Sequence, residues 1–287
     1  MRFKTKDFDL KQTLECGQCF RFKKIEDYHY IVIAKGVLEI KQSGDVLDFI
    51  NIGLHDFFGY WNNYFDLKTD YSKIKSDIIE RQPFMKEIIE KGSGIHILRQ
   101  DPLETIVSFI ISQNKRIPQI KNCIEILCNE YGEKVSYNGE NYSLFPSLDV
   151  LKTLTVDDFK KCKVGFRDKY LYETIQKIAN GEFSLEYTDD IEKRLCSLYG
   201  IGPKVAACIA LFAYHQVSVF PIDTWIKKMM TTLYFKGKNI GIKEIEGKSK
   251  LFGPYRGIAQ QYLFFAAISE PDILEKIEGK GYNIEKY

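Results

Sequence analysis

The first 50 residues of the 287-residue chain alternate apolar and polar positions in short runs. Alternation of this kind predicts β-strands, because successive side chains of a strand point to opposite faces. Gly36 and residues 43–45 have the small and polar character of turns. The predicted strands are residues 20–22, 28–34, 37–40 and 46–50. Strands joined by such short links pair in sequence order, which predicts an antiparallel sheet.

Apolar residues at helical spacing replace this alternation further along the chain. Helical patterns begin near His55, and almost everything after Pro102 is helical in pattern. A Gly-Ser-Gly break at residues 92–94 marks the predicted domain boundary. Strands first and helices afterwards predict an α+β fold that is mostly helical. We expect an N-terminal antiparallel sheet domain with flanking helices, residues 1–94, and an all-α domain, residues 95–287.

The most informative pattern is a helix, a glycine turn and a second helix within residues 189–214. Gly200 and Gly202 suit a tight turn, since glycine reaches positive φ without strain. Pro203 fits the first turn of the helix that follows. The N–H groups at such a helix N-terminus have no partner within the helix and form a ready phosphate site. The pattern therefore predicts a helix-hairpin-helix that binds phosphate.

A lysine and an aspartate follow this hairpin. Lys204 comes directly after it, and Asp223 stands nineteen residues later, in the loop of residues 219–225, where it is placed to cap the next helix. The ordinary interpretation is a buried helix pair with a solvated lysine and a helix cap. A neutral lysine is also a nucleophile, and a carboxylate stabilises positive charge that develops beside it. The spacing of this pair after the hairpin favours the enzyme interpretation.

The motif Leu-x-Gly-x-Gly-x-Lys-Val-Ala-x-Cys at residues 198–208, followed by Pro-x-Asp at residues 221–223, resembles the helix-hairpin-helix DNA glycosylases with the Gly/Pro…Asp loop. The run at residues 204–208 is similar to the 8-oxoguanine DNA glycosylase/lyase branch. The resemblance implies a repair enzyme that flips 8-oxoguanine out of duplex DNA and excises it. It implies that Lys204 forms a Schiff base with the sugar, that Asp223 stabilises charge on the sugar, and that β-elimination then breaks the strand.

A second stretch, residues 14–22, resembles the family's Gly-Gln-x-Phe-Arg run at the lesion pocket. Without the hairpin motif, its glycine would be interpreted as a turn that leads into a strand. The resemblance implies that the Gly17 carbonyl reads the damaged base, because guanine has a bare N7 acceptor whereas 8-oxoguanine carries a hydrogen there. It also implies that Cys208 and Phe264 cover the two faces of the flipped base. Gln260 would bond the Watson–Crick edge, although core packing is the ordinary role of this helix.

Further matches to the family imply contacts with DNA. Asn114 would enter the gap left by the flipped base, where an amide can both donate and accept. Phe166 would wedge between base pairs or, equally, pack in the core. The remaining predicted DNA contacts are Lys115, Arg116, Gln119, Arg167, Gly200 and Gly202. Gln119 replaces an arginine that reads the opposite cytosine in eukaryotic relatives, so strict preference for cytosine is not expected; Trp225 and Ala267 are further departures.

Charge and cysteine content narrow this interpretation. A net charge of +2 means that any nucleic-acid surface is a local patch. The seven scattered cysteines predict free thiols in a reducing cytoplasm. Cys16 and Cys19 have zinc-like spacing without a second pair, so we expect no metal, with zinc there as the minor alternative. No cysteine follows Cys208 to build the iron–sulfur loop of some relatives. No cofactor is expected beyond a monovalent or Ca/Mg cation at the hairpin–phosphate contact, which the resemblance implies.

The expected partner is double-stranded DNA containing 8-oxoguanine, bound by a monomer. No apolar run reaches the ~20 residues that cross a bilayer, so we expect no membrane contact. With no secretion signal, the expected location is cytoplasmic, and nucleoid-associated if the source is prokaryotic.

Two other functions also fit parts of this sequence. A non-catalytic helix-hairpin-helix module would use the hairpin for phosphates alone, and a monofunctional alkyl-purine glycosylase would lack the lysine nucleophile. Lys204 argues against both, and its pairing with Asp223 strengthens the case against the first. Chance similarity of an unrelated helical protein is disfavoured, because the motifs occur in family order from Gly17 to Phe264.

Overall fold

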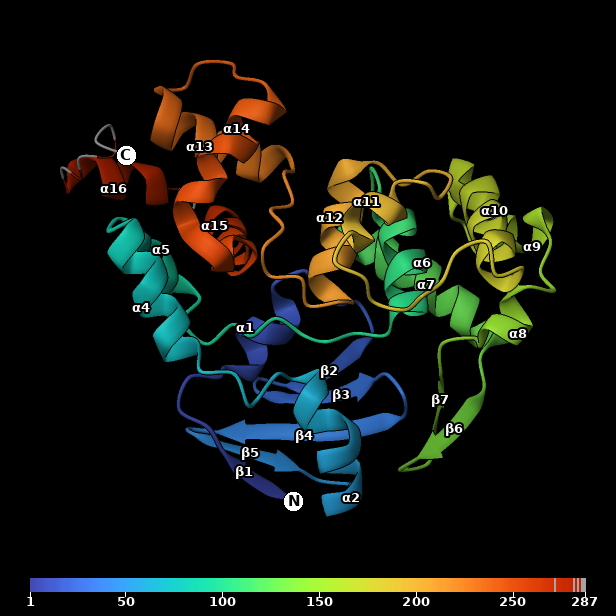
Figure 1. The fold of residues 1–287 in the computed structure, drawn as a ribbon. Helices are drawn as coiled ribbons and strands as arrows, with labels where there is room; N and C mark the ends of the chain where they lie inside the picture. The colour runs from blue at the N-terminus through green and yellow to red at the C-terminus, as the bar shows by residue number, and fades with distance from the viewer. Residues whose placement is uncertain (271, 281, 283, 285–287) are drawn as a thin grey trace.

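The computed structural model of the protein describes residues 1–270, 272–280, 282 and 284. An antiparallel sheet forms the N-terminal part of the chain and helices form most of the rest (Figure 1). The expected α+β, mostly helical fold is therefore confirmed.

The N-terminal sheet has five strands in the order β1-β5-β4-β3-β2, and every neighbouring pair is antiparallel. Its inner face is apolar and packs on a short turn of π-helix, where the Phe49 and Phe57 ring centroids lie 4.9 Å apart. The strands are β1 (Arg2–Lys4), β2 (Phe22–Glu26), β3 (His29–Ile33), β4 (Val37–Ser43) and β5 (Val46–Phe49). The helical elements that accompany them are α1 (Leu10–Glu15), α2 (Leu54–Asp56), η1 (Phe57–Trp61) and α3 (Asn62–Tyr64).

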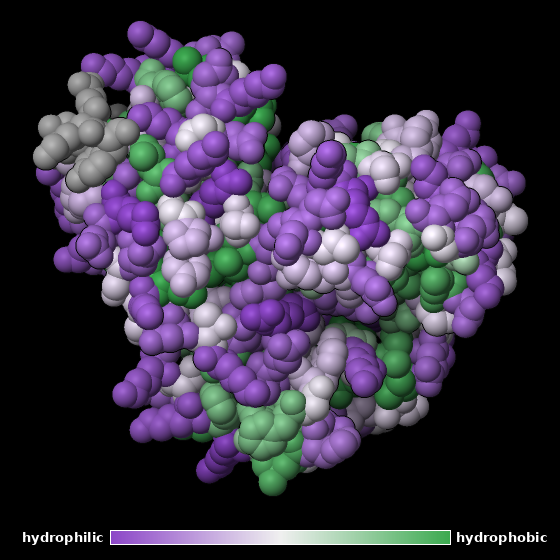
Figure 2. All heavy atoms as spheres, in the orientation of Figure 1, coloured by the Kyte–Doolittle hydropathy of each residue, from purple (hydrophilic) through white to green (hydrophobic). Residues whose placement is uncertain are grey.

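The remaining helices form two groups above the sheet (Figure 1). One group consists of α6 (Pro102–Ser112), α7 (Ile117–Tyr131), α8 (Leu148–Leu151), α9 (Val156–Lys161), η2 (Gly165–Arg167), α10 (Asp168–Ala179), α11 (Ile191–Leu195) and α12 (Pro203–Phe212). The other consists of α4 (Tyr71–Arg81), α5 (Met85–Lys91), α13 (Thr224–Phe235), α14 (Ile242–Ser249), η3 (Lys250–Tyr255), α15 (Arg256–Ser269) and α16 (Ile273–Gly279). The surface is hollowed between the two groups in the space-filling view of Figure 2.

Helices α4 and α5 belong by packing to the helical part of the molecule. They contact η3 and α15, and their apolar residues share one continuous core with α6 and α12. The sheet has a separate core with η1 and α3. The chain before the predicted boundary at residue 94 therefore contributes helices to both cores.

The expectation of an all-α second part is wrong at one place. A hairpin of β6 (Lys134–Tyr137) and β7 (Glu140–Ser143) lies between α7 and α8. Its turn residues Asn138 and Gly139 have φ of 51° and 77°, as a two-residue hairpin turn requires. The hairpin reaches back to the N-terminal sheet, where Glu140 pairs with Lys23 at 2.7 Å.

A buried carboxylate, that of Asp66, links the segment after α3 to His215 in the chain beyond α12. Asp66 is 4% exposed and its carboxylate lies 3.0 Å from both Arg99 Nε and His215 Nε2. Tyr71 also donates to it, at 3.0 Å. Burial opposes ionisation, but the His215 and Arg99 partners outweigh it and hold the pKa of Asp66 well below its usual range. The charge therefore stabilises the folded state.

We expect Asp66→Asn to lower the unfolding free energy at pH 7 by roughly 3 kcal/mol, because it removes the buried charge that pairs with Arg99 and His215. A carboxyl whose pKa is depressed by folding stabilises above its unfolded pKa and loses that contribution as pH falls below about 4. Denaturant unfolding at pH 7 and below pH 4 should show the difference between wild type and variant narrowing with acid. Asp48→Asn, which removes an exposed partner of Arg2, is the control and should change little. Equal stability of both variants at pH 7 would refute the stabilising role.

Candidate functional site

The glycine turn between α11 and α12 is shaped by one left-handed residue. Gly200 has φ +82°, and a Cβ built there would lie 2.4 Å from Tyr170 Cδ2. Gly202 is the N-cap of α12 with φ −93°, and a Cβ there would meet nothing within 4 Å. Gln113 Nε2 donates to the Gly200 carbonyl at 3.0 Å and so ties the turn to the end of α6. Backbone conformation and lack of space therefore require glycine at position 200, whereas at position 202 the glycine is a helix cap with room for a side chain.

Lys204 lies in the first turn of α12 and is exposed. Its Nζ is 6.0 Å from the centroid of the Phe109 ring. Cys208, one helical turn further, is buried, and burial raises the pKa of its thiol. The charge of Lys204 opposes this rise and that of Asp223 adds to it. Lys204 and Cys208 lie one helical turn apart, so both project from the same side of α12.

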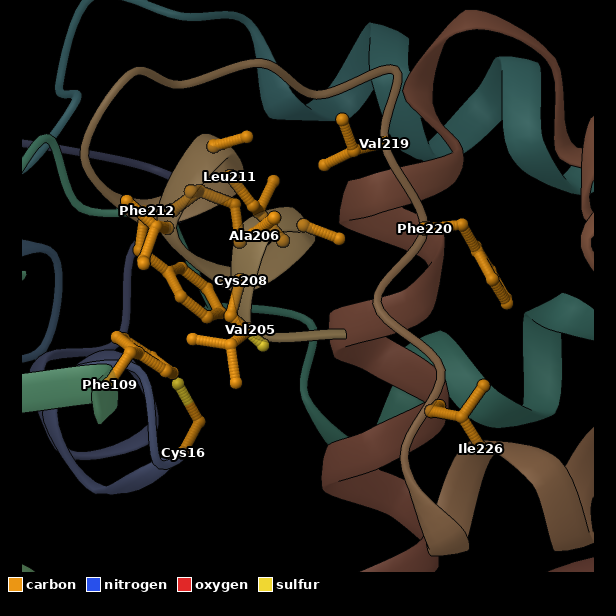
Figure 3. Packing of buried hydrophobic residues seen from close by; sticks show 14 of the residues in the cluster. Cys16, Phe109, Val205, Ala206, Cys208, Leu211, Phe212, Val219, Phe220 and Ile226 are labelled. Carbon is orange, nitrogen blue, oxygen red and sulfur yellow. The ribbon is translucent and has the colours of Figure 1, made fainter. Parts of the chain in front are cut away.

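Asp223 is the N-cap of α13, as the sequence predicts. Its Oδ1 accepts the Ile226 N–H at 2.8 Å. The segment that leads to it is held against α15, where the Gly257 N–H donates to the Val217 carbonyl at 2.8 Å. A Cβ on Gly257 would lie 2.9 Å from the carbonyl oxygens of Val217 and Val219, so this close approach depends on glycine. Figure 3 shows the segment beside α12, opposite Phe109.

Gly17 and Phe264 face each other although they come from opposite ends of the chain. Gly17 has φ +84°, and a Cβ there would lie 3.4 Å from Phe264 Cε1. Gln260 precedes Phe264 by one helical turn, so both project from the same side of α15. Gln260 is buried, and its Oε1 has no hydrogen-bond partner within the part of the chain that the structure describes. A buried amide oxygen without a partner is costly, which is typical of a group reserved for a ligand.

The loop that carries Gly17 is fixed by its neighbour Gln18, to which the sequence analysis gave no role. Gln18 is fully buried; its Nε2 donates to the carbonyls of Thr13 and His96 at 2.9 and 2.8 Å. Its Oε1 accepts the Leu98 N–H at 2.9 Å. In the sequence, the signal for this role of Gln18 was a polar glutamine among the apolar residues of a loop that is buried.

Two cavities lie near this loop. One, of about 390 Å³, lies further along β2, and the other, of about 330 Å³, adjoins Gly17.

The predicted DNA contacts near α7 are exposed or lie at its start. Asn114 is exposed with φ 51°, in the turn between α6 and α7. Lys115 Nζ donates to the Lys163 carbonyl at 3.2 Å, and Arg116 is exposed at the N-cap of α7. Gln119 Oε1 accepts the Arg116 N–H at 3.0 Å, so its side chain already serves the helix end.

Phe166 is exposed at the surface, whereas its neighbour Arg167 is buried. Phe166 is 58% exposed on η2, which favours the wedge interpretation over core packing. Arg167 is buried; its Nη1 donates to the Val164 carbonyl at 2.9 Å, and its guanidinium carbon lies 4.2 Å from the Phe166 ring centroid. In this position it has no access to a phosphate or base. We therefore revise its predicted DNA contact to a support for Phe166 through a cation–π contact.

The thiols with zinc-like spacing are turned into the core. Cys16 donates to the Thr13 carbonyl at 3.3 Å, and burial raises the pKa of its thiol to about 12. Cys19 is also buried and donates to the Leu14 carbonyl at 3.6 Å. Among the described residues, no group of three or more His, Cys, Asp and Glu side chains is placed to hold a metal. None of the helices in the same residues has the length and apolar character of a membrane span.

Several known proteins similar to this chain are 8-oxoguanine DNA glycosylases or N-glycosylase/DNA lyases. A family model described as the N-terminal domain of 8-oxoguanine DNA glycosylase matches residues 1–106. The N-glycosylase/DNA lyase OGG1 of Arabidopsis thaliana is 30% identical, over 91% of this chain and 78% of that protein. The 8-oxoguanine glycosylase/lyase of Clostridium acetobutylicum, solved with duplex DNA containing cytosine opposite 8-oxoG, is 41% identical and has a TM-score of 0.89, over 94% of this chain and 98% of that one. The chain belongs to the 8-oxoguanine DNA glycosylase/lyase family.

A more distant structure, the 3-methyladenine DNA glycosylase of Archaeoglobus fulgidus, has a TM-score of 0.77 at 16% identity, over 94% of this chain and 98% of that one. At this identity the likeness shows a shared fold alone. The glycosylase/lyase family assignment made from the hairpin and Gly17 motifs is confirmed.

The two hairpin glycines of this glycosylase/lyase family member give a matched pair of variants. Gly200→Ala should lower the unfolding free energy by roughly 2–4 kcal/mol, because it combines a left-handed backbone with a clash against Tyr170. Gly202→Ala should cost less than about 1 kcal/mol, since only the cap preference changes. Denaturant unfolding of both variants measures this difference. Similar losses for the two variants would show that the turn does not depend on the Gly200 conformation.

Proposed function

We propose that the protein excises 8-oxoguanine from duplex DNA and cleaves the strand at the resulting abasic site, with Lys204 as the nucleophile. The observation that supports this most directly is that Lys204 stands exposed in the first turn of α12, directly after the Gly200 turn and one helical turn before the buried Cys208. Membership of the 8-oxoguanine glycosylase/lyase family supports both activities.

The reaction begins when the damaged nucleotide leaves the stack, because the bond to be cut is hidden in a duplex. The neutral Lys204 amine attacks the sugar C1′, and the bond between C1′ and the base breaks with its electrons going to the base, which takes up a proton. Asp223 stabilises the positive charge that develops on the sugar.

Strand cleavage uses the same lysine. The C1′ adduct then opens: the electron pair of the lysine nitrogen forms a C=N bond to C1′, the C1′–O4′ bond breaks, and O4′ takes up a proton, which gives an imine between the lysine and the sugar. This imine acidifies C2′, which loses a proton, and the electrons expel the 3′ phosphate oxygen. Hydrolysis of the imine then restores the Lys204 amine. The protein supplies nucleophile, charge stabilisation and position, so the chemistry needs no organic cofactor.

The Gly17 carbonyl is proposed to recognise the lesion. It accepts from the N7 hydrogen of 8-oxoguanine, whereas it repels the lone pair of guanine at the same position. Phe264 covers one face of the base and Cys208 the other. Gln260 supplies its amide to the Watson–Crick edge, and its unpartnered Oε1 supports this role because a donor from the base would satisfy it.

The DNA around the flipped nucleotide is held by groups on the same surface. Asn114 fills the gap in the stack, and Phe166 wedges between neighbouring base pairs. The hairpin amides at Gly200 and Gly202 and the charges of Lys115 and Arg116 serve the phosphates. A monovalent, Ca or Mg cation at this contact would be held by backbone carbonyls of the turn and by phosphate oxygens, since oxygen atoms suit such cations.

Lys204→Gln should retain binding to an 8-oxoguanine duplex and lose excision by at least ~10³-fold, as expected when a nucleophile is removed. Borohydride should trap the wild type covalently on the lesion duplex and leave this variant untrapped. Lys193→Gln, at an exposed position on α11, is the matched control and should be trapped like the wild type. Full excision by Lys204→Gln would remove the proposed nucleophile, and excision without any trapped wild type would indicate a monofunctional enzyme.

Gly17→Ala should weaken the preference for 8-oxoguanine over guanine by roughly tenfold, since a misplaced acceptor leaves buried polar groups unmatched. Alanine at φ +84° is strained, and its Cβ would contact Phe264. Competition binding with lesion and undamaged duplexes measures the preference. Cleavage at a preformed abasic site should change less, because it needs no base. A larger effect on abasic cleavage than on preference would contradict the proposed reading of the base.

A further inference from the structure

We infer that Gln261 is a positioning residue for base recognition, which holds the Gly17 carbonyl in its reading direction. Gln261 is 2% exposed, and its Nε2 donates to the Cys16 carbonyl at 2.9 Å. Cys16 directly precedes Gly17, so this bond fixes the peptide plane on the N-terminal side of the glycine. The inference rests on the proposed reading of the lesion by Gly17.

The residue that follows Gly17 is anchored as well. The Gln18 side chain donates to the Thr13 and His96 carbonyls and accepts the Leu98 N–H, and the Gln18 carbonyl, in the next peptide along, accepts from Gln100 Nε2 at 2.8 Å. Glycine has the greatest backbone freedom of any residue, so a Gly17 carbonyl that must point in one direction needs the chain to be held on both sides of the glycine. Gln261 supplies the bond from α15 to the peptide plane on the N-terminal side.

The same bond joins the two walls of the proposed base pocket. Gln261 lies on α15 next to Gln260, and Phe264 of the same helix faces Gly17. The donor and acceptor are 245 residues apart, so no local geometry sets the spacing between these walls. A shift of the Gly17 loop relative to α15 would change how the base is sandwiched and how it is read at the same time. The adjacent glutamines thus divide two tasks: Gln261 is committed to the loop, and Gln260 Oε1 lacks a partner among the described residues.

The test compares specificity with overall activity in the full chain. Gln261→Met keeps the length of the side chain and removes the donor, and Gln261→Asn keeps the amide but shortens its reach by one methylene. Binding of 8-oxoguanine and guanine duplexes is measured in the Lys204→Gln background, where no excision occurs. Cleavage of a preformed abasic site is measured with Lys204 intact. Gln82→Met is the matched control, because Gln82 is a buried glutamine bonded to Tyr234 outside this pocket.

We expect Gln261→Met to reduce the preference for the lesion by roughly tenfold, the cost of leaving one buried carbonyl unpaired. Gln261→Asn should lose less, and both should keep abasic cleavage close to that of the wild type. Thermal unfolding of each variant establishes that it is folded; if Gln261→Met is not, Gln261→Asn carries the comparison. Gln82→Met should leave the preference unchanged.

Other outcomes overturn the inference. Parallel losses of lesion binding, guanine binding and abasic cleavage would mean that Gln261 serves stability alone. Unchanged preference in the Gln261 variants, with a reduced preference in Gly17→Ala, would reject the positioning role and leave the proposed function intact. Unchanged preference in Gly17→Ala as well would reject the reading of the base by Gly17, and the role of Gln261 with it.

Discussion

The site depends on one constraint: a backbone loop near the N-terminus must stay fixed against a helix near the C-terminus. Residues 16–18 form this loop, and α15 is the helix. Their contact includes a buried hydrogen bond, from Gln261 of α15 to the Cys16 carbonyl, and Gln18 ties the same loop to the Thr13 and His96 carbonyls. Apolar contacts tolerate small shifts, whereas a buried polar group that loses its partner costs about 1–3 kcal/mol. Buried polar bonds therefore specify the geometry more sharply than the surrounding core does.

The local features of the site could be predicted from sequence because their causes are local. The glycine turn, the proline at the start of α12 and the cap at Asp223 each act within a few residues, and each is found where the pattern places it. The strands of the N-terminal sheet follow from alternation in the same way. The hairpin β6–β7 also had a local signal in Asn138-Gly139, but its short strands are mostly polar and interrupt a helical region.

Features that depend on distant partners could not be predicted from sequence. The packing of α4 on η3 and of α5 on α15 has no trace in the periodicity of α4 and α5, which shows only that each helix has an apolar face. The positions of Gln18 and Gln261 follow from contacts across 80 and 245 residues. The motif thus located the chemistry, while the long-range contacts set its geometry.

The Gln119 side chain has two competing uses: a hydrogen bond at the start of α7, and contact with a DNA base. Its Oε1 accepts the Arg116 N–H at the start of α7, and a hydrogen bond of this kind contributes a net of about 0.5–1.5 kcal/mol. A good bidentate contact with a base edge contributes about 1–3 kcal/mol of discrimination. The two energies are similar, so a glutamine that gives up its cap to read a base gains little net preference. An arginine has no acceptor and so cannot make this cap, which leaves its donors available for a base. The expectation that Gln119 imposes no strict preference for cytosine stays a prediction, which the bond to the Arg116 N–H supports.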